Sequence, residues 1–348
     1  MRTAGEERLE NLRYRSTIKT LSKRLATTVE GGDKVCISYH DTVQNISVDC
    51  DYNGGLAFPQ HASAIDASHA AFLVGNNEIG NLAIARDTFE GDATRGNHNL
   101  YQIFSGPQNV AGTVGCGGST CFNVVYMGVS TDGGVTFTDH VVHLNPNINV
   151  SYGHQFTNVS VDRKGNVYAI YCDNHNIFYS YSTNQGVTWS APHRVNKTPA
   201  NTAIFPWSVA GNAGALDVVY YGTSHSPAPG EVPDTYPASA AWHVYFAQNV
   251  HATTAGSTFT QVAASPVNHR GAVCESGVGC TGNRDLLDDF GVAASPKTGL
   301  ASIVYTDDQF RANDTKNPNA PGCTAATTNT SSCEHTTFST QLTGTRIY

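Results

Sequence analysis

Two stretches of eight residues decide the fold, Ser130-Thr-Asp-Gly-Gly-Val-Thr-Phe137 and Ser182-Thr-Asn-Gln-Gly-Val-Thr-Trp189. Each follows a run rich in Val, Ile and Tyr that is typical of a strand, at 124–129 and 177–181. In such a turn an Asp or Asn side chain accepts hydrogen bonds from backbone N–H groups, glycine supplies a positive φ, and the aromatic residue packs back onto the sheet. The residues that we expect to make these contacts are Ser130, Asp132, Gly134, Phe137, Ser182, Asn184, Gly186 and Trp189.

Weaker copies of the turn occur at 51–58 and 252–259, and a second repeat accompanies them. It consists of a strand, a tight turn and another strand, at 156–173, 205–221 and 290–306. One full unit is therefore a four-stranded antiparallel sheet, which is typical of a propeller blade. Two further blades without the turn fit 61–110 and 285–345, so we predict an all-β chain with six blades.

The eight-residue turn resembles the Asp-box, or bacterial neuraminidase repeat, and the chain from 35 to 345 resembles the six-bladed propellers of the sialidase superfamily. The resemblance implies a site at the mouth of the central channel. Active members of that family use an arginine triad, a Tyr nucleophile activated by Glu, and an Asp acid/base. The family's early Arg-Ile-Pro or Arg-Leu-Pro motif is absent here, and none of the arginines can be assigned to the triad from the sequence.

The first 34 residues differ from the rest of the chain. They hold eight basic and five acidic residues, whereas the remaining 314 hold 12 basic and 23 acidic ones. Ile18, Leu21, Leu25 and Val29 form one stripe of a helix. Residues 5–34 resemble a fragment of the bacterial small-subunit ribosomal protein family number twenty, through Glu7–Asn11, Arg13–Thr20 and Val29–Asp33.

We therefore divide the chain into a basic segment with a short α-helix, 1–34, and a β-propeller, 35–348. The basic segment is either a fusion or gene-model artefact or a short basic helix without a special role. From Val29 to Tyr39 the sequence repeats the strand, turn and strand pattern. The junction between the two segments thus falls in the innermost strand of the first blade.

Eight of the nine cysteines form close pairs in the sequence, as in a disulfide-bonded protein from an oxidising compartment. We expect an extracellular or cell-surface protein whose native signal peptide is missing, or a cytoplasmic one if the basic segment is genuine. The alternative is a set of scattered free thiols. The expected pairs are Cys36 with Cys50, Cys116 with Cys121, Cys274 with Cys280, and Cys323 with Cys333, which leaves Cys172 as a buried thiol.

Composition excludes several classes of protein. The formal net charge is −8, which disfavours nucleic-acid binding except through residues 5–34. No run of 18 apolar residues exists, so we expect no membrane span. We expect a monomer. No phosphate loop or nucleophile elbow occurs, and we expect that no cofactor is required. Whether the protein binds a structural cation is left open by the sequence.

The densest polar cluster, Asn283–Phe290, precedes an innermost strand and should lie at the mouth of the channel. Its adjacent carboxylates could do acid/base work or bind a cation, or they could simply cap strands and pair with arginine. Asp307-Asp308 is a weaker candidate, and His140 and His143 are spaced to face opposite sides of a strand, which disfavours a metal pair. The candidate site residues are Arg284, Asp285, Asp288 and Asp289.

Three functions remain open. The first is a secreted propeller that binds a glycan or protein through the channel mouth and the long loops at 107–120, 222–240 and 308–334. The second is an exo-acting glycoside hydrolase of the sialidase type. The third is an rRNA-binding protein through the basic segment alone. Fold class does not choose among them, because propellers carry many unrelated sites.

Overall fold

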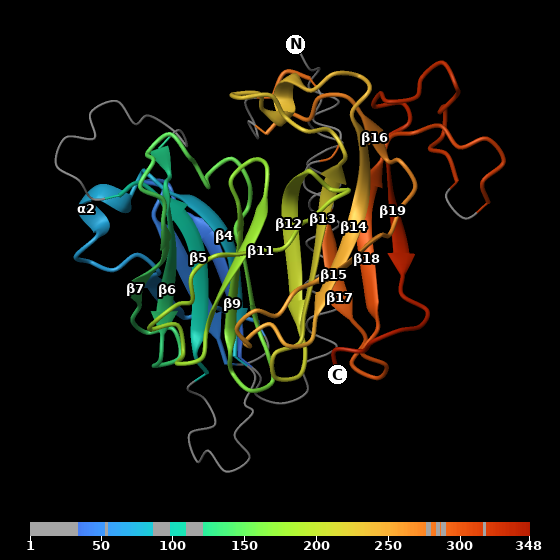
Figure 1. Cartoon of the computed structure of the whole chain (residues 1–348). Helices are drawn as coiled ribbons and strands as arrows, with labels where there is room; N and C mark the ends of the chain where they lie inside the picture. The colour runs from blue at the N-terminus through green and yellow to red at the C-terminus, as the bar shows by residue number, and fades with distance from the viewer. Residues whose placement is uncertain are drawn as a thin grey trace.

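The structure is a computed structural model, and nearly all of its regular secondary structure is β-strand (Figure 1). The described residues include one short helix, α2 (Ala70–Leu73), and the 3-10 turn η2 (Pro233–Thr235). The expected helix within residues 1–34 lies outside the described part of the chain. The structure describes residues 34–52, 55–85, 98–108, 121–275, 280–282, 286, 290–315 and 318–348.

The described strands form five antiparallel sheets, and apart from the short β16, neighbours in each sheet follow one another along the chain. The first sheet holds β1 (Val35–His40), β2 (Ile46–Asp51) and β3 (Gln60–Ser63). The second holds β4 (Glu78–Ile84), β5 (Leu100–Gly106), β6 (Val124–Ser130) and β7 (Thr138–Leu144). The third holds β8 (Asn158–Val161), β9 (Val167–Cys172), β10 (Ile177–Ser182) and β11 (His193–Arg194).

The remaining two sheets complete the described fold. The fourth holds β12 (Thr202–Ala210), β13 (Leu216–Thr223), β14 (Ala241–Asn249) and β15 (Thr260–Ala263), with β16 (His269–Arg270) beside β14. The fifth holds β17 (Gly291–Ala294), β18 (Ala301–Asp307) and β19 (His335–Thr340).

First strands of successive sheets lie against one another, which is the arrangement of propeller blades. β4 contacts β8, β8 contacts β12, and β12 contacts β17. Middle strands such as β9 and β13 are buried on both faces because a sheet covers each side, and their sequences are accordingly rich in Val, Ile, Leu and Tyr. The outer strand β7 shows the mixed burial of a strand with one face in water.

The described residues form five sheets where the sequence predicted six blades. The stretch 61–110, expected to be a blade of its own, instead supplies β4 and β5 to the sheet that also holds β6 and β7. β5 and β6 pair although the long connection 107–123 separates them in the sequence. Because of this long connection, the sequence spacing of one blade was interpreted as two blades. The second expected blade, 285–345, corresponds to the β17–β19 sheet.

Both eight-residue turns contain a closed set of hydrogen bonds. Asp132 Oδ1 accepts the N–H groups of Val135 and Thr136 at 3.0 Å each, and Ser130 Oγ accepts that of Gly134 at 2.7 Å. In the second turn, Asn184 Oδ1 accepts Thr188 N–H at 3.0 Å, and Ser182 Oγ accepts Gly186 N–H at 2.9 Å. The Asp or Asn side chain thus satisfies backbone donors that the bend removes from the sheet.

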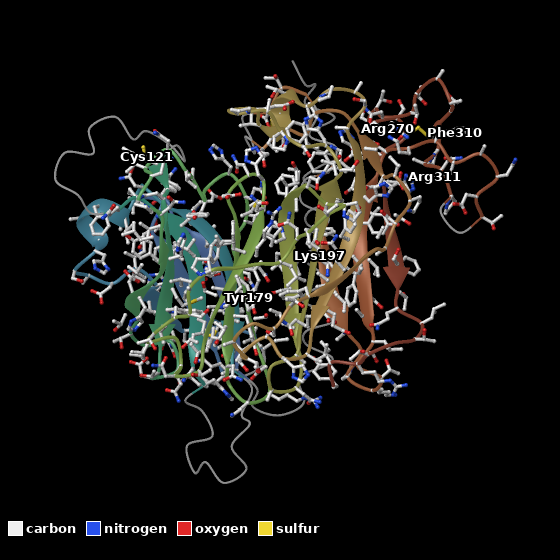
Figure 2. The ribbon with its side chains drawn as sticks, viewed as in Figure 1. Cys121, Tyr179, Lys197, Arg270, Phe310 and Arg311 are labelled. Atoms are coloured by element: carbon white, nitrogen blue, oxygen red, sulfur yellow. A yellow bond between two sulfur atoms is a disulfide. The ribbon has the colours of Figure 1, made fainter. Side chains whose placement is uncertain are left out.

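Each of these turns packs onto the sheet that precedes its own. Gly186, at φ +81°, lies so close to the second sheet that an added Cβ would sit 2.8 Å from Val129, so only glycine fits. Phe137 packs among Ile46 and Val48 of the first sheet. The 252–259 segment does the same, since Phe259 meets the ring of Tyr179 edge-on at 5.3 Å (Tyr179 is labelled in Figure 2).

Three of the four expected disulfides are present. Their Cα–Cα distances are 4.1 Å for Cys36–Cys50, 6.0 Å for Cys274–Cys280 and 4.5 Å for Cys323–Cys333. The first is short because the two cysteines face each other in the β1–β2 register. Cys116 lies outside the described residues, so the pair with Cys121 stays a prediction. Cys172 is a buried free thiol, as predicted.

We predict that Trp189→Ala lowers the free energy of unfolding by about 2 kcal/mol and Phe137→Ala by about 3–5 kcal/mol. Phe137 is 8% exposed. Trp189 is only half-buried, and its indole N–H donates a hydrogen bond to Gly186 O at 2.9 Å. Urea unfolding measures both values. The control Val187→Ala, 53% exposed in the same turn, should change the free energy by less than about 0.5 kcal/mol. Equal losses for all three would show that the aromatic residues do not fasten the sheets.

Candidate functional site

An apolar pocket of about 250 Å³ lies beside β12 and the segments that enter β8 and β17. First strands of a propeller surround its axis, so residues just before or within them face the central channel. Phe156 stands out because 44% of its surface is exposed although it lines a cavity. The described lining residues are Phe156, Phe205, Pro206, Trp207, Leu286 and Phe290.

The backbone of β12 is distorted where it borders this pocket. Phe205 has a φ of +51°, and the pairing with β13 shifts register between Ile204 and Trp207. This bulge turns the residues around Pro206 toward the pocket. On the opposite wall, Phe290 stacks on Tyr221 with ring centroids 4.5 Å apart. The aromatic lining is therefore held by both the bulge and the stack.

A chain of hydrogen-bonded polar side chains begins at the backbone of the distorted strand β12. The N–H of Phe205 donates to Gln155 Oε1 at 2.7 Å, and Gln155 Nε2 in turn donates to Glu275 Oε1. The N–H of Glu275 donates to Asp234 Oδ1 at 2.8 Å. Gln155 precedes β8, Glu275 lies between β16 and β17, and Asp234 lies in the β13–β14 connection. Three segments far apart in sequence thus meet next to the pocket.

Glu275 is the most perturbed carboxyl of this group. Burial raises its pKa well above the ordinary glutamate value, the negative charge of Asp234 raises it further, and the hydrogen bond from Gln155 opposes the rise. The side chain is 6% exposed. Burial also lowers the pKa of the neighbouring His154, against the influence of Asp234. Burial thus opposes ionisation of both the Glu275 carboxyl and the His154 imidazole.

All four candidates from the sequence, Arg284, Asp285, Asp288 and Asp289, lie outside the described residues. Leu286 and Phe290, which belong to the same stretch, line the pocket. The sequence analysis missed Gln155 and Glu275. The rule used for the acidic cluster, that a segment entering a first strand lies at the channel, applies equally to Gln155 and could have found it. Nothing local marks Glu275, because its burial depends on Gln155 and Asp234.

The weaker candidate pair, Asp307-Asp308, is held in the interior. Asp307 pairs with Arg311, which also donates to Val267 O (Arg311 is labelled in Figure 2). Asp308 Oδ2 lies 2.6 Å from His269 Nδ1. Both carboxylates are fully buried and already bonded, and Asp308 connects the fifth sheet to His269 of the fourth.

No group of three or more His, Cys, Asp or Glu side chains within the described residues is arranged to hold a metal ion. His143 instead stacks on Tyr171 at a centroid distance of 5.6 Å, and burial lowers the pKa of both His140 and His143. In the described part of the chain, no helix has the length and apolar character that a membrane span requires.

A scan against models of protein families found no match, and a search of curated proteins found none either. Solved structures are similar to the chain at low identity. The K499G mutant of NanB sialidase from Streptococcus pneumoniae is 10% identical over 75% of this chain and 32% of that chain, with a TM-score of 0.42. The GH62 α-L-arabinofuranosidase catalytic domain of Coprinopsis cinerea is 12% identical over 66% and 60%, with a TM-score of 0.35.

A luciferin-regenerating enzyme is also similar, at 9% identity over 90% of this chain and 76% of that chain, with a TM-score of 0.41. The chain spans about a third of the length of the NanB structure.

We predict that Glu275→Gln flattens the pH dependence of stability. A carboxyl whose folded-state pKa is raised binds its proton more tightly in the native state. Its contribution is therefore present below the unfolded value of about 4.3 and is lost as the pH rises toward the folded value. Glutamine does not titrate and can still accept the Gln155 hydrogen bond. The measurement is urea unfolding at several pH values between 4 and 9. The free energy of unfolding of the variant should increase relative to that of the wild type as the pH rises.

The control is Asp234→Asn, which removes the charge that adds to the shift at Glu275. It should narrow the pH range over which stability falls without removing the fall. Parallel curves for wild type and Glu275→Gln would contradict a raised pKa at this carboxyl.

Proposed function

We propose that this protein is a glycan-binding propeller that holds a sugar ring in the aromatic pocket at its channel. The observation that carries the proposal is the exposed aromatic lining: Phe156 and Trp207 present apolar surface in a concave site. Sugar rings offer apolar C–H faces and hydroxyl edges, and they suit sites that combine aromatic walls with a few polar groups. The buried pair Gln155 and Glu275 is joined to this pocket through the N–H of Phe205, which is itself a lining residue.

The disulfides support an extracellular location, since such bonds persist in oxidising compartments. We further propose that the 130–137 and 182–189 turns are Asp-box repeats and that the acidic cluster at Arg284–Asp289 contributes to the mouth of the channel. No described lining residue of the pocket is basic, which favours a neutral sugar over one that carries a carboxylate.

A second candidate is an exo-acting glycoside hydrolase. Glu275 favours it, because glycosidases commonly use one carboxylic acid of raised pKa to protonate the leaving oxygen and a second carboxylate as base or nucleophile. Asp234 is an exposed carboxylate bonded to the backbone of Glu275. Protein binding at the same mouth, and rRNA binding through residues 5–34, stay open as alternatives.

We predict that Phe156→Ala weakens glycan binding at least tenfold, because it removes an exposed aromatic wall of the pocket. The probe is a panel of immobilised neutral and sialylated oligosaccharides, followed by calorimetry with the strongest binder. Phe338→Ala is the matched control, since Phe338 is exposed but does not line this pocket. Equal binding by both variants, or no binding to any glycan by the wild type, would overturn the proposal.

For the hydrolase candidate, we expect Glu275→Gln to lower kcat/KM at least a hundredfold on whichever fluorogenic glycoside is cleaved, with sialoside included in the panel. The loss should also remove the basic limb of the pH profile, where the acid loses its proton. If the wild-type protein binds a glycan but cleaves no glycoside of the panel, the result would support the binding function and contradict the catalytic one.

A further inference from the structure

A buried histidine, His269 on β16, has a hydrogen-bond acceptor at each of its two ring nitrogens. Its Nδ1 lies 2.6 Å from Asp308 Oδ2, and its Nε2 lies 3.0 Å from the backbone oxygen of Ala272. His269 is 1% exposed, and Asp308 is fully buried. A neutral imidazole carries one N–H, so it can donate to only one of two acceptors. Contacts on both sides of the ring therefore require a proton on each nitrogen.

Asp308 supplies the negative charge that matches such an imidazolium. Its Oδ1 accepts a hydrogen bond from Gln309 Nε2 at 2.6 Å, while its Oδ2 faces His269. Two accepting oxygens are typical of an ionised carboxylate, because a protonated carboxyl must donate from one of them. The contact between Asp308 and His269 is thus a charge-assisted hydrogen bond in the interior.

The buried charges around His269 balance only while its ring is charged. From β14, which pairs with β16, the uncharged Trp242 lies opposite His269, and Arg270, the next residue of β16, is exposed. Asp307 is buried and paired with Arg311. Tyr305 lies near that pair and near Asp314. Loss of the ring proton would leave the carboxylate partner of His269 buried without a counter-charge, which is unfavourable.

On one side this contact holds the loop between β18 and β19, which the structure describes at 308–315 and 318–334. The N–H of Asn329 donates to Asp308 O at 2.8 Å. The N–H of Arg270 donates to Asn329 Oδ1, also at 2.8 Å (Arg270 is labelled in Figure 2). Both ends of the loop are therefore attached to β16 next to the histidine.

On its other side His269 holds the turn that leads to Glu275. Ala272, whose backbone oxygen faces the ring, lies three residues before Glu275 in the chain. Between them the N–H of Val273 donates to Pro233 O at 3.0 Å. The protonated ring therefore connects the β18–β19 loop with the segment that carries the buried carboxyl of the candidate site.

We propose that protonated His269 is a pH-sensitive clasp between the β18–β19 loop and the segment before Glu275, and that loss of its ring proton opens this clasp as the pH rises. A histidine that is charged in the folded state contributes stability at low pH, and this contribution is lost as the pH rises through its folded-state titration. The neutral ring keeps only one of its two hydrogen bonds. The clasp does not depend on which ligand the aromatic pocket binds.

The first test follows the imidazole signals of the full chain, labelled with ¹⁵N-histidine, by NMR during a pH titration. We expect His269 to keep a proton on both ring nitrogens to about one pH unit or more above the pH at which the exposed His251 loses one. Titration of the two histidines over the same pH range would overturn the proposal.

The second test is hydrogen exchange at pH 7 and pH 9.5, corrected for the intrinsic exchange rates. Protection of the Arg270 and Asn329 N–H groups should fall about tenfold at the higher pH, relative to the amides of β13. His269→Asn should show weak protection at both pH values, because asparagine does not titrate. The matched control is His243→Asn, since His243 is a half-buried histidine of the same sheet with its Nδ1 3.2 Å from Ser265 O. It should behave as the wild type does.

Both measurements are repeated in the Glu275→Gln variant, because Glu275 lies on the same segment and also titrates. A pH-dependent loss of protection that disappears in this variant would assign the effect to Glu275 and contradict the clasp. Unchanged protection in the wild type, or equal protection in the two histidine variants, would contradict it as well. If His269→Asn does not fold, the titration of the wild-type protein decides.

Discussion

The packing of each repeated turn onto the preceding sheet is the interaction on which the rest of the molecule depends. A sheet with two apolar faces cannot stand alone in water, and these turns join it to its neighbour at the periphery. Two contacts illustrate this packing: Gly186 lies against Val129 of the second sheet, and Phe259 lies against Tyr179 of the third. Tyr179 also donates its hydroxyl to Ala252 O at 3.0 Å, so the join is both apolar and hydrogen-bonded.

Because the turns fix the periphery, the first strands are left to meet at the centre. There the segments before β8 and β17 come together with the bulge of β12. Gln155 links the β12 bulge to the segment before β17. Its side chain accepts a hydrogen bond from the N–H of Phe205 and donates one to Glu275. The candidate site is therefore a consequence of the blade arrangement, and its polar groups come from segments that share no local motif.

The fold was largely predictable, whereas the site was not. Hairpin turns with Asp or Asn, Gly and an aromatic residue depend on contacts within eight residues, so their sequence carries the signal. The number of sheets was harder: β5 and β6 pair across a long connection, and loop length does not restrict pairing in an antiparallel sheet. The perturbed pKa of Glu275 depends on burial and on Asp234, some forty residues away, which no local pattern records.

By itself, the sequence determined the β-rich character, the repeated turns, the three disulfide pairs that the structure describes, and the buried state of Cys172. Each of these follows from short-range spacing or from the apolar character of one strand. Only the tertiary structure decided that Phe156 and Trp207 border a cavity and that Glu275 is a buried carboxyl. The reason is physical: exposure and electrostatic environment depend on which distant segments pack together, and that is settled only when the sheets assemble.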